Sequence, residues 1–98
     1  MNKELKVKMN VELQDMIGRL LPSIFESINP GVRNLVLGDK WRIWQVHVSD
    51  VETQLRLGDR SSSVVPELLL LDKSSLMDIH DKALLISELY KLIYILEK

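Results

Sequence analysis

The stretches "NLVLGDKW" (residues 34–41) and "QLRLGDRS" (residues 54–61) repeat one pattern twenty residues apart: Leu, any residue, Leu, Gly, Asp and a base. A Gly-Asp pair between two extended runs suits a two-residue hairpin loop, because glycine readily takes the positive φ that a type II′ turn requires. The repeat therefore predicts that the middle of the chain folds into antiparallel strands joined by tight turns.

These turns fix a strand pairing. With loops at 38–39, 49–50 and 58–59, Leu37 pairs with Lys40, Trp44 pairs with Leu55, and Leu57 pairs with Arg60 in a third hairpin. One face then collects a set of apolar side chains, and a one-residue slip would scramble it. The set is Leu35, Leu37, Trp44, Val46, Val48, Val51, Leu55 and Leu57. We expect three or four strands, the fourth being a weak edge because it holds three serines and Pro66.

The segment before this sheet, residues 2–28, carries apolar residues at steps of three and four, which predicts a helix. An alternation of Leu5, Val7 and Met9 leaves a short strand at 3–9 as the alternative. Gly18 and Pro22 predict a kink or break near residues 21–22. The tripeptide Asn-Pro-Gly at 29–31 predicts a turn.

The last segment predicts a long helix that begins at Ser74 or Ser75, with Asp78 completing a capping box. Two apolar seams cover about half of its circumference, which is wider than the ~100° stripe of an ordinary surface helix. One seam is Leu85, Leu89, Leu92 and Leu96, and the other is Leu76, Ile79, Ala83, Ile86, Tyr90 and Ile93. The sheet covers one seam, so the other packs on the N-terminal helix or on another chain.

Together these elements predict one α+β domain spanning residues 1–98: an N-terminal helix, a small antiparallel β-meander of 3–4 strands, and a long C-terminal helix packed on the sheet. Cysteine is absent, which removes disulfides and thiolate nucleophiles. The first ten residues show no secretory signal, and no apolar run approaches the ~20 residues of a membrane span. We therefore expect a cytoplasmic protein that does not enter membranes.

The outer sheet face is the first candidate site, because an exposed Trp beside an Arg is typical of binding hot spots. The same pair is able to stack on a base, with nearby basic residues meeting a phosphate. The alternative is that the N-terminal helix covers this face and turns Trp41 and Ile43 into core. The candidate residues are Val36, Lys40, Trp41, Arg42, Ile43, Arg56 and Arg60.

The C-terminal helix is the second candidate site. A contiguous exposed apolar strip on a small monomer is a liability, which favours a subunit or partner interface there. Burial of both seams within one subunit is the alternative. The candidate interface residues are Leu85, Leu89, Tyr90, Leu92, Tyr94 and Leu96.

No motif indicates catalysis. His47 opposite Glu52 lacks a nucleophile and is better explained as a surface cross-strand pair. Thirteen basic against fourteen acidic residues give no support for generic nucleic-acid binding. We expect a non-enzymatic protein without cofactor or metal that forms a homo-oligomer and acts by binding another macromolecule, as a small inhibitor, adaptor or assembly factor does. The alternative is a protein that binds a small ligand, a nucleotide or a nucleic acid.

Overall fold

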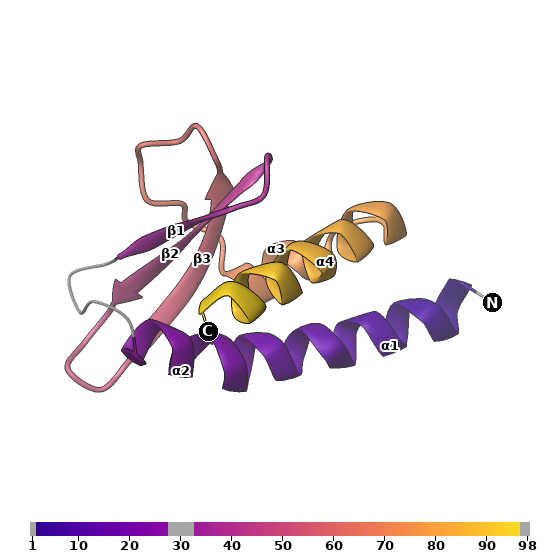
Figure 1. Cartoon of the computed structure of the whole chain (residues 1–98), viewed down its shortest axis with the longest axis horizontal. Coiled ribbons are helices and arrows are strands. Elements are labelled where there is room, and N and C mark those ends of the chain that lie inside the picture. Colours follow the sequence, from indigo (N-terminus) through magenta and orange to yellow (C-terminus); the bar gives the residue numbers. More distant parts are fainter. Residues whose placement is uncertain (1, 28–32, 97–98) are drawn as a thin grey trace.

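The computed structural model describes residues 2–27 and 33–96, without the side chains of residues 2, 27 and 96. A helical rod formed by α1 (Asn2–Asp15), η1 (Met16–Leu20) and α2 (Leu21–Ser27) runs along one side of the molecule. Three strands follow, β1 (Asn34–Leu37), β2 (Trp41–His47) and β3 (Thr53–Asp59), and then two helices, α3 (Leu70–Ser75) and α4 (Ile79–Leu96). The α+β class is confirmed, with a three-stranded antiparallel meander in the order β1-β2-β3 (Figure 1). The turn predicted at 29–31 lies outside the described residues.

The N-terminal rod is helical from residue 2, so the strand alternative for residues 3–9 is wrong. The disturbance predicted near Pro22 is present in another form. Residues 16–20 form a π-helical turn, closed by a hydrogen bond that the Leu21 N–H donates to the Met16 carbonyl. Because proline cannot donate and its ring crowds the carbonyl four residues earlier, a widened turn just before it is an alternative to breaking the helix. The rod then continues as α2.

The strand pairing differs by one residue from the prediction in both hairpins. Leu37 lies opposite Trp41 instead of Lys40, and Trp44 lies opposite Arg56 instead of Leu55. Each loop has three residues where two were expected: residues 38–40 in the first, and 49–51 in the second, between Val48 and Glu52.

Because side chains alternate between the faces of a strand, this one-residue shift exchanges the inner and outer side chains of β2 relative to the prediction. Trp41 and Ile43 therefore face the helices and are buried, whereas Trp44 and Val46 lie on the outer face. The predicted inner face is correct for β1 and β3, where Leu37 and Leu57 are buried, and wrong for β2.

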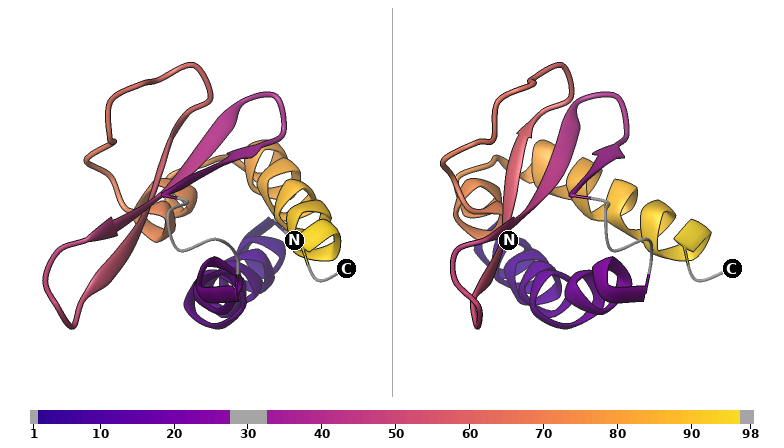
Figure 2. Two further views of the ribbon diagram at one scale, coloured as in Figure 1. Left: turned by 60° about the vertical axis from the view of Figure 1, so that its left-hand side comes forward. Right: turned by 90° about the vertical axis from the view of Figure 1, so that its left-hand side faces the viewer.

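The second Gly-Asp pair makes no hairpin. Strand β3 continues through Gly58 to Asp59, and residues 60–68 cross back over the outer face of the sheet as an irregular segment (Figure 2). A Cβ at Gly58 would lie 2.5 Å from Cγ of Pro66, so this glycine permits a close approach. Among residues 2–27 and 33–96, only Gly38 has a positive φ, of 64°. The predicted third hairpin and fourth strand are therefore absent from the described residues.

The C-terminal segment consists of two helices instead of one. Helix α3 ends at Ser75, and α4 is capped by Asp78, whose Oδ1 accepts a hydrogen bond of 2.8 Å from the Asp81 N–H. Asp78 is thus the N-cap itself, and the predicted capping box at Ser75 is wrong.

The core lies between the sheet and the helices, which all occupy one side of the sheet (Figure 2). Helix α4 contacts β1, α1 and α2, and α3 contacts β3 and α1. The buried apolar residues come from every element: Leu13, Met16, Leu21, Ile24, Phe25, Leu37, Trp41, Ile43, Leu57, Leu70, Leu85, Ile86, Leu89 and Ile93.

Candidate functional site

The predicted outer-face patch is divided between core and surface. Trp41 and Ile43 are 7% and 0% exposed, so the prediction that they lie on the outer face is wrong. They belong to the core because the shifted register places them on the inner face, and not because the N-terminal helix covers the outer face. Val36 and Arg56 do lie on the outer face, and the residue across from Arg56 is Trp44 where Ile43 was expected. The Nε1 atom of Trp44 is buried and has no hydrogen-bond acceptor among the described residues.

The arginines of this patch bind the protein's own oxygen atoms. Arg42 donates to Asn34 Oδ1 at 2.6 Å and to the Arg60 carbonyl at 3.1 and 3.2 Å. Arg56 donates to the Pro66 carbonyl at 3.2 Å and to Gln54 Oε1 at 3.0 Å. These bonds occupy guanidinium N–H groups that would otherwise be available to bind a phosphate. They also hold the 60–68 segment against the sheet.

The two exposed bases of the patch are also paired at the loop end of the sheet. Arg60 donates to the Gly38 carbonyl at 2.8 Å and lies 3.6 Å from an oxygen of Asp39. Lys40 Nζ is 3.5 Å from Asp81 Oδ1 and 5.9 Å from the centre of the Trp41 ring. Exposed pairs of this kind contribute little stability and leave both bases accessible to solvent.

His47 and Glu52 do not face each other. The Nδ1 atom of His47 lies 3.0 Å from the Thr53 hydroxyl, and the Glu52 backbone closes the loop with Val48 and Ser49. Across residues 2–27 and 33–96, no three His, Asp or Glu side chains are placed to hold a metal ion.

The candidate interface on α4 is mostly internal to the protomer. Leu85 and Leu89 are fully buried and Leu92 is half-buried, so the predicted surplus of apolar surface is wrong for these residues. Tyr90 and Tyr94 are 48% and 64% exposed. The side chain of Leu96 lies outside those described.

Tyr90 also joins two helices. Its hydroxyl donates a hydrogen bond to Oε1 of Glu12 on α1, and this bond, with burial and the negative charges of Glu12 and Asp15, raises the pKa of Tyr90. Other exposed apolar residues of α4 are Leu84 and Ile95, which the sequence seams did not include.

The surface with the clearest binding geometry is a groove along β3, here called the β3 groove, of about 320 Å³. One wall is the π-helical turn and the start of α2, the second is the first half of β3, and the third is the region around α3. Most of its lining side chains are apolar. The lining residues are Ile17, Gly18, Pro22, Thr53, Gln54, Leu55, Leu69 and Leu71.

The backbone of β3 beside this groove faces away from the sheet. Even-numbered residues carry the ladder to β2, because Val48 donates to the Glu52 carbonyl and Arg60 donates to the Lys40 carbonyl. Odd-numbered residues of β3 therefore direct their N–H and C=O groups to the free edge. Leu57 uses its N–H there to bind the Leu68 carbonyl at 3.3 Å.

The two halves of this edge differ. Residues 68–69 cover the second half, with a β-bridge between Arg56 and Leu69. On the side away from β2, no described segment pairs with Thr53, and the edge from Thr53 to Leu55 borders the β3 groove. An uncovered strand edge beside an apolar groove is a template for an added strand.

Sequence reasoning did not identify the β3 groove. Its residues come from three distant segments, and each has an ordinary local explanation as part of an amphipathic helix or a strand. The only local signal was the pairing of Gly18 with Pro22, which disturbs the helix at the groove wall; π turns of this kind are frequent at functional sites.

No helix among the described residues combines the length and apolarity that crossing a membrane requires. Comparison with known proteins provides no relative: no family model matches the chain, and no curated protein and no solved structure is significantly similar to it.

Proposed function

We propose that this is a non-enzymatic interaction protein of the cytoplasm that binds an extended segment of a partner protein along the free edge of β3. The observation that carries the proposal is the position of the uncovered edge at Thr53, directly beside the β3 groove. The groups singled out for acid–base chemistry, His47 and Glu52, do not converge, which favours a binding role over catalysis.

An added strand satisfies both parts of the site. Its backbone pairs with the outward N–H and C=O groups of β3, which supplies affinity independent of sequence. Its alternate side chains enter the β3 groove and meet Ile17, Leu55 and Leu69, which supplies a preference for apolar residues at every second position.

A variant pair separates the edge from the side chains around it. In Thr53→Pro the outward N–H is lost while the ladder bonds of the even-numbered residues remain, since proline is tolerated on edge strands. Thr53→Val is the matched control, because it keeps the N–H, has the same shape, and loses the same contact to His47.

The test is selection of displayed random ten-residue peptides on the immobilised chain, followed by titration of the selected peptides. We expect apolar residues at alternate positions, and a tenfold or greater weakening of binding in Thr53→Pro with little change in Thr53→Val. Failure to select any peptide, or equal affinity for both variants, would contradict the proposal. Circular dichroism establishes that both variants are folded.

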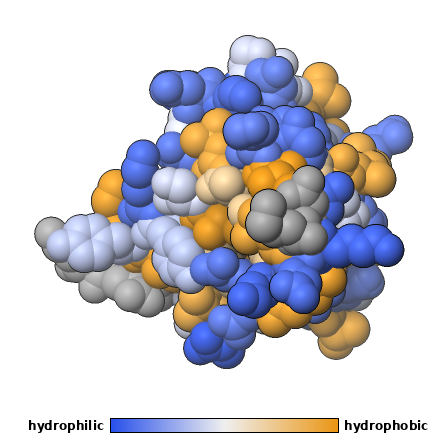
Figure 3. All heavy atoms as spheres, turned by 90° about the vertical axis from the view of Figure 1, so that its right-hand side faces the viewer, coloured by the Kyte–Doolittle hydropathy of each residue, from blue (hydrophilic) through white to orange (hydrophobic). Residues whose placement is uncertain are grey.

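We also propose that the protein self-associates, using the exposed side of α4. Support comes from Leu84 and Ile95, which are 37% and 66% exposed on the same side of this helix. The end of the molecule where α1 begins shows apolar atoms interrupted by hydrophilic side chains, without one continuous patch (Figure 3). Because two apolar side chains bury little surface, we expect a weak dimer, detectable by light scattering at high micromolar concentration and lost in Ile95→Lys. A monomer of 11.3 kDa at every concentration would exclude it.

The second candidate function is binding of a nucleotide or nucleic acid at Trp44. A groove of about 230 Å³ lies beside Trp44, between Arg33, His47 and Val65, and the indole N–H there has no acceptor among the described residues. Binding would change the Trp44 fluorescence in wild type and not in Trp44→Phe. No change with a panel of nucleotides and oligonucleotides would remove this candidate.

A further inference from the structure

Lys82, in the first turns of α4, is the most unusual charged residue of the protein. It is 2% exposed, and its Nζ donates a 2.7 Å hydrogen bond to Oδ1 of Asn10 on α1. The four ion pairs found among the described residues all lie at least partly on the surface, and none includes Lys82. These partly exposed residues are thus paired with opposite charges, whereas the buried ammonium group of Lys82 is paired with a neutral amide.

One amide oxygen does not balance a buried ammonium. The group carries a full positive charge and three donors, and burial of a charge is unfavourable unless an opposite charge and further acceptors compensate it. The Asn10 oxygen accepts one of the three donors and supplies only a partial negative charge. An anion near this position would therefore be stabilised.

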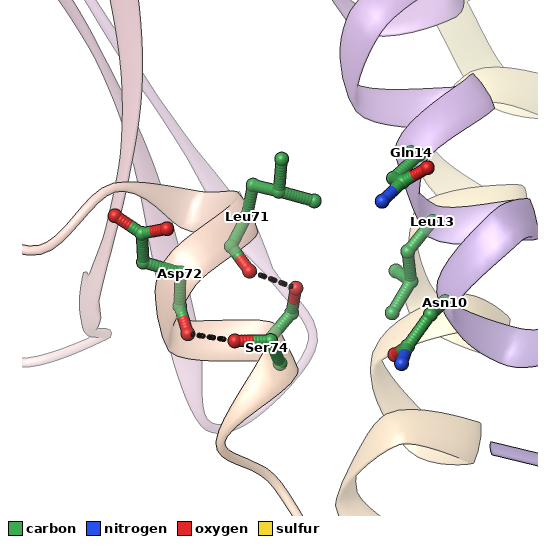
Figure 4. Close-up of a pocket in the computed structure, with 7 residues that line it drawn as sticks. Asn10, Leu13, Gln14, Leu71, Asp72 and Ser74 are labelled. Atoms are coloured by element: carbon green, nitrogen blue, oxygen red, sulfur yellow. Dashed lines mark hydrogen bonds between the residues drawn. The ribbon is translucent and has the colours of Figure 1, made fainter. Parts of the chain in front are cut away.

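Asn10 also lines a cleft of about 130 Å³ between α1 and α3, here called the α1–α3 cleft. Gln14 extends into it from α1, and Leu71 extends toward it from α3 (Figure 4). This volume accommodates several non-hydrogen atoms, given that a water molecule takes up ~30 Å³ in the liquid. Lys82 is not one of the lining residues, so its charge acts on the cleft through the Asn10 amide to which it is hydrogen-bonded.

The donors of the cleft are the two side-chain amides. Because Oδ1 of Asn10 is bound to Lys82, the Asn10 Nδ2 group is the end left to donate, and the neighbouring ammonium polarises it into a stronger donor. The hydroxyls of Ser74 and Ser75 already donate to the carbonyls of Leu71 and Asp72, at 2.8 and 2.7 Å. The planar amides of Asn10 and Gln14, together with the single positive charge of Lys82, suit a planar anion that carries one negative charge.

We propose that the α1–α3 cleft binds a carboxylate, held by the amides of Asn10 and Gln14 and neutralising Lys82. Lys82 supplies one positive charge, which balances a monoanion and not phosphate or another dianion, and the carboxylate of Asp72 points away from the cleft (Figure 4). The carboxylate belongs either to a small free acid or to the segment bound in the β3 groove. Leu71 lines both the cleft and the groove, so the two sites adjoin.

The first experiment uses sodium acetate against sodium chloride and phosphate, at constant ionic strength and pH 7, with the full chain. We expect acetate to raise the melting temperature and to shift the side-chain amide signals of Asn10 and Gln14 in nuclear magnetic resonance spectra, with smaller effects from phosphate. Lys82→Met, which keeps the length and loses the charge, should fold and lose at least tenfold in acetate affinity.

Asn10→Asp is the decisive second variant, because it supplies the missing carboxylate within the chain. It should melt a few degrees above wild type without any added ligand and should no longer respond to acetate. In Gln14→Glu, on the exposed side of the cleft, the response to acetate should weaken while the melting temperature stays near that of wild type. A lower melting temperature in Asn10→Asp, or full acetate binding in Lys82→Met, would overturn the proposal.

The second arm identifies the source of the carboxylate and alone rests on the proposed function. Selected peptides are compared with versions in which each carboxylate is replaced by its amide. If amidation lowers peptide affinity tenfold for wild type and not for Lys82→Met, the carboxylate belongs to the bound segment. If acetate binds but amidation leaves peptide affinity unchanged, the carboxylate belongs to a free acid. Thr53→Pro should keep acetate binding, so failure of the peptide proposal is distinguished from failure of this one. No response to acetate and no effect of amidation would refute the carboxylate site.

Discussion

The two Leu-Gly-Asp-base stretches have the same residues and different structural roles. The first reverses the chain, with Gly38 at a φ of 64°, and the second lies at the end of a strand, where Gly58 leaves room for the Pro66 ring. They meet in space, because Trp41 pairs with Asp59 and Arg60 binds the Gly38 carbonyl. The local pattern therefore shows where a glycine stands. The surrounding structure decides whether the glycine is needed for its backbone conformation or because a side chain would not fit.

The largest expected effect is at Gly58. A methyl group there would lie 2.5 Å from Cγ of Pro66, so the 60–68 segment must move off the sheet. We expect Gly58→Ala to lower the free energy of unfolding by about 2–3 kcal/mol, in the range of overpacking substitutions. Urea denaturation measures it.

A double-mutant cycle sharpens this result. Pro66→Ala removes the Cγ atom and leaves Cβ at 3.4 Å from the added methyl group, so Gly58→Ala should cost much less in that background. Equal costs in both backgrounds would show that the close approach is not the reason for glycine.

Gly38→Ala should cost about 1–2 kcal/mol, because a residue with a side chain is strained in the left-handed region. The added methyl group would also lie 2.7 Å from Cδ of Glu88, a flexible side chain that is able to move. Glu88→Ala should therefore restore little of the loss, and Gly38→Asn should be tolerated better than Gly38→Ala. Full restoration by Glu88→Ala would mean that space, and not φ, requires this glycine.

Arg60→Ala should lower stability by about 0.5–1 kcal/mol, because it removes the 2.8 Å bond to the Gly38 carbonyl that joins the two stretches. Lys40→Ala, at the equivalent position of the first stretch, should be close to neutral because its partner, Asp81, is exposed and 3.5 Å away. Thermal denaturation of the two variants compares them directly, and a larger effect at Lys40 would reverse the assignment.

The smallest expected effect is at Asp59. The backbone N–H and the hydroxyl of Ser61 both donate to Asp59 Oδ1, at 2.9 and 2.8 Å, and these bonds lower the pKa of Asp59. A lowered folded-state pKa stabilises the protein above the unfolded-state pKa, near 3.9, and this stabilisation is lost as the pH falls through the folded-state pKa. Asp59→Asn should flatten the acid limb of a stability–pH curve slightly, and an acid limb identical to that of wild type would contradict this assignment.

Strand β2 shows why the sequence did not settle the register. It carries apolar residues on both faces, with Trp41 and Ile43 on one and Trp44 and Val46 on the other. Either face provides an apolar surface, so alternation alone could not choose between them. One extra residue in each loop decided it, and loop length depends on backbone geometry that Gly-Asp does not specify.

Lys82 shows a second limit. Its place on α4 follows from the sequence, since it lies four residues before Ile86 and seven before Leu89 on the apolar side, and a charge in that position was a detectable signal. Its partner was not detectable, because Asn10 is 72 residues away and only the packing of α1 on α4 brings the two together.

By itself the sequence determined the α+β class, a helix in the N-terminal segment, the first three of the three or four expected strands, and the apolar side of α4. These features depend on periodicity and on local backbone preferences, which act over a few residues. The tertiary structure decided which face of β2 is buried, why Gly38 and Gly58 are needed, and where the open edge of β3, the groove beside it and the buried Lys82 lie. All of these depend on contacts between segments far apart in the chain, where small differences in packing geometry choose between arrangements of similar local quality.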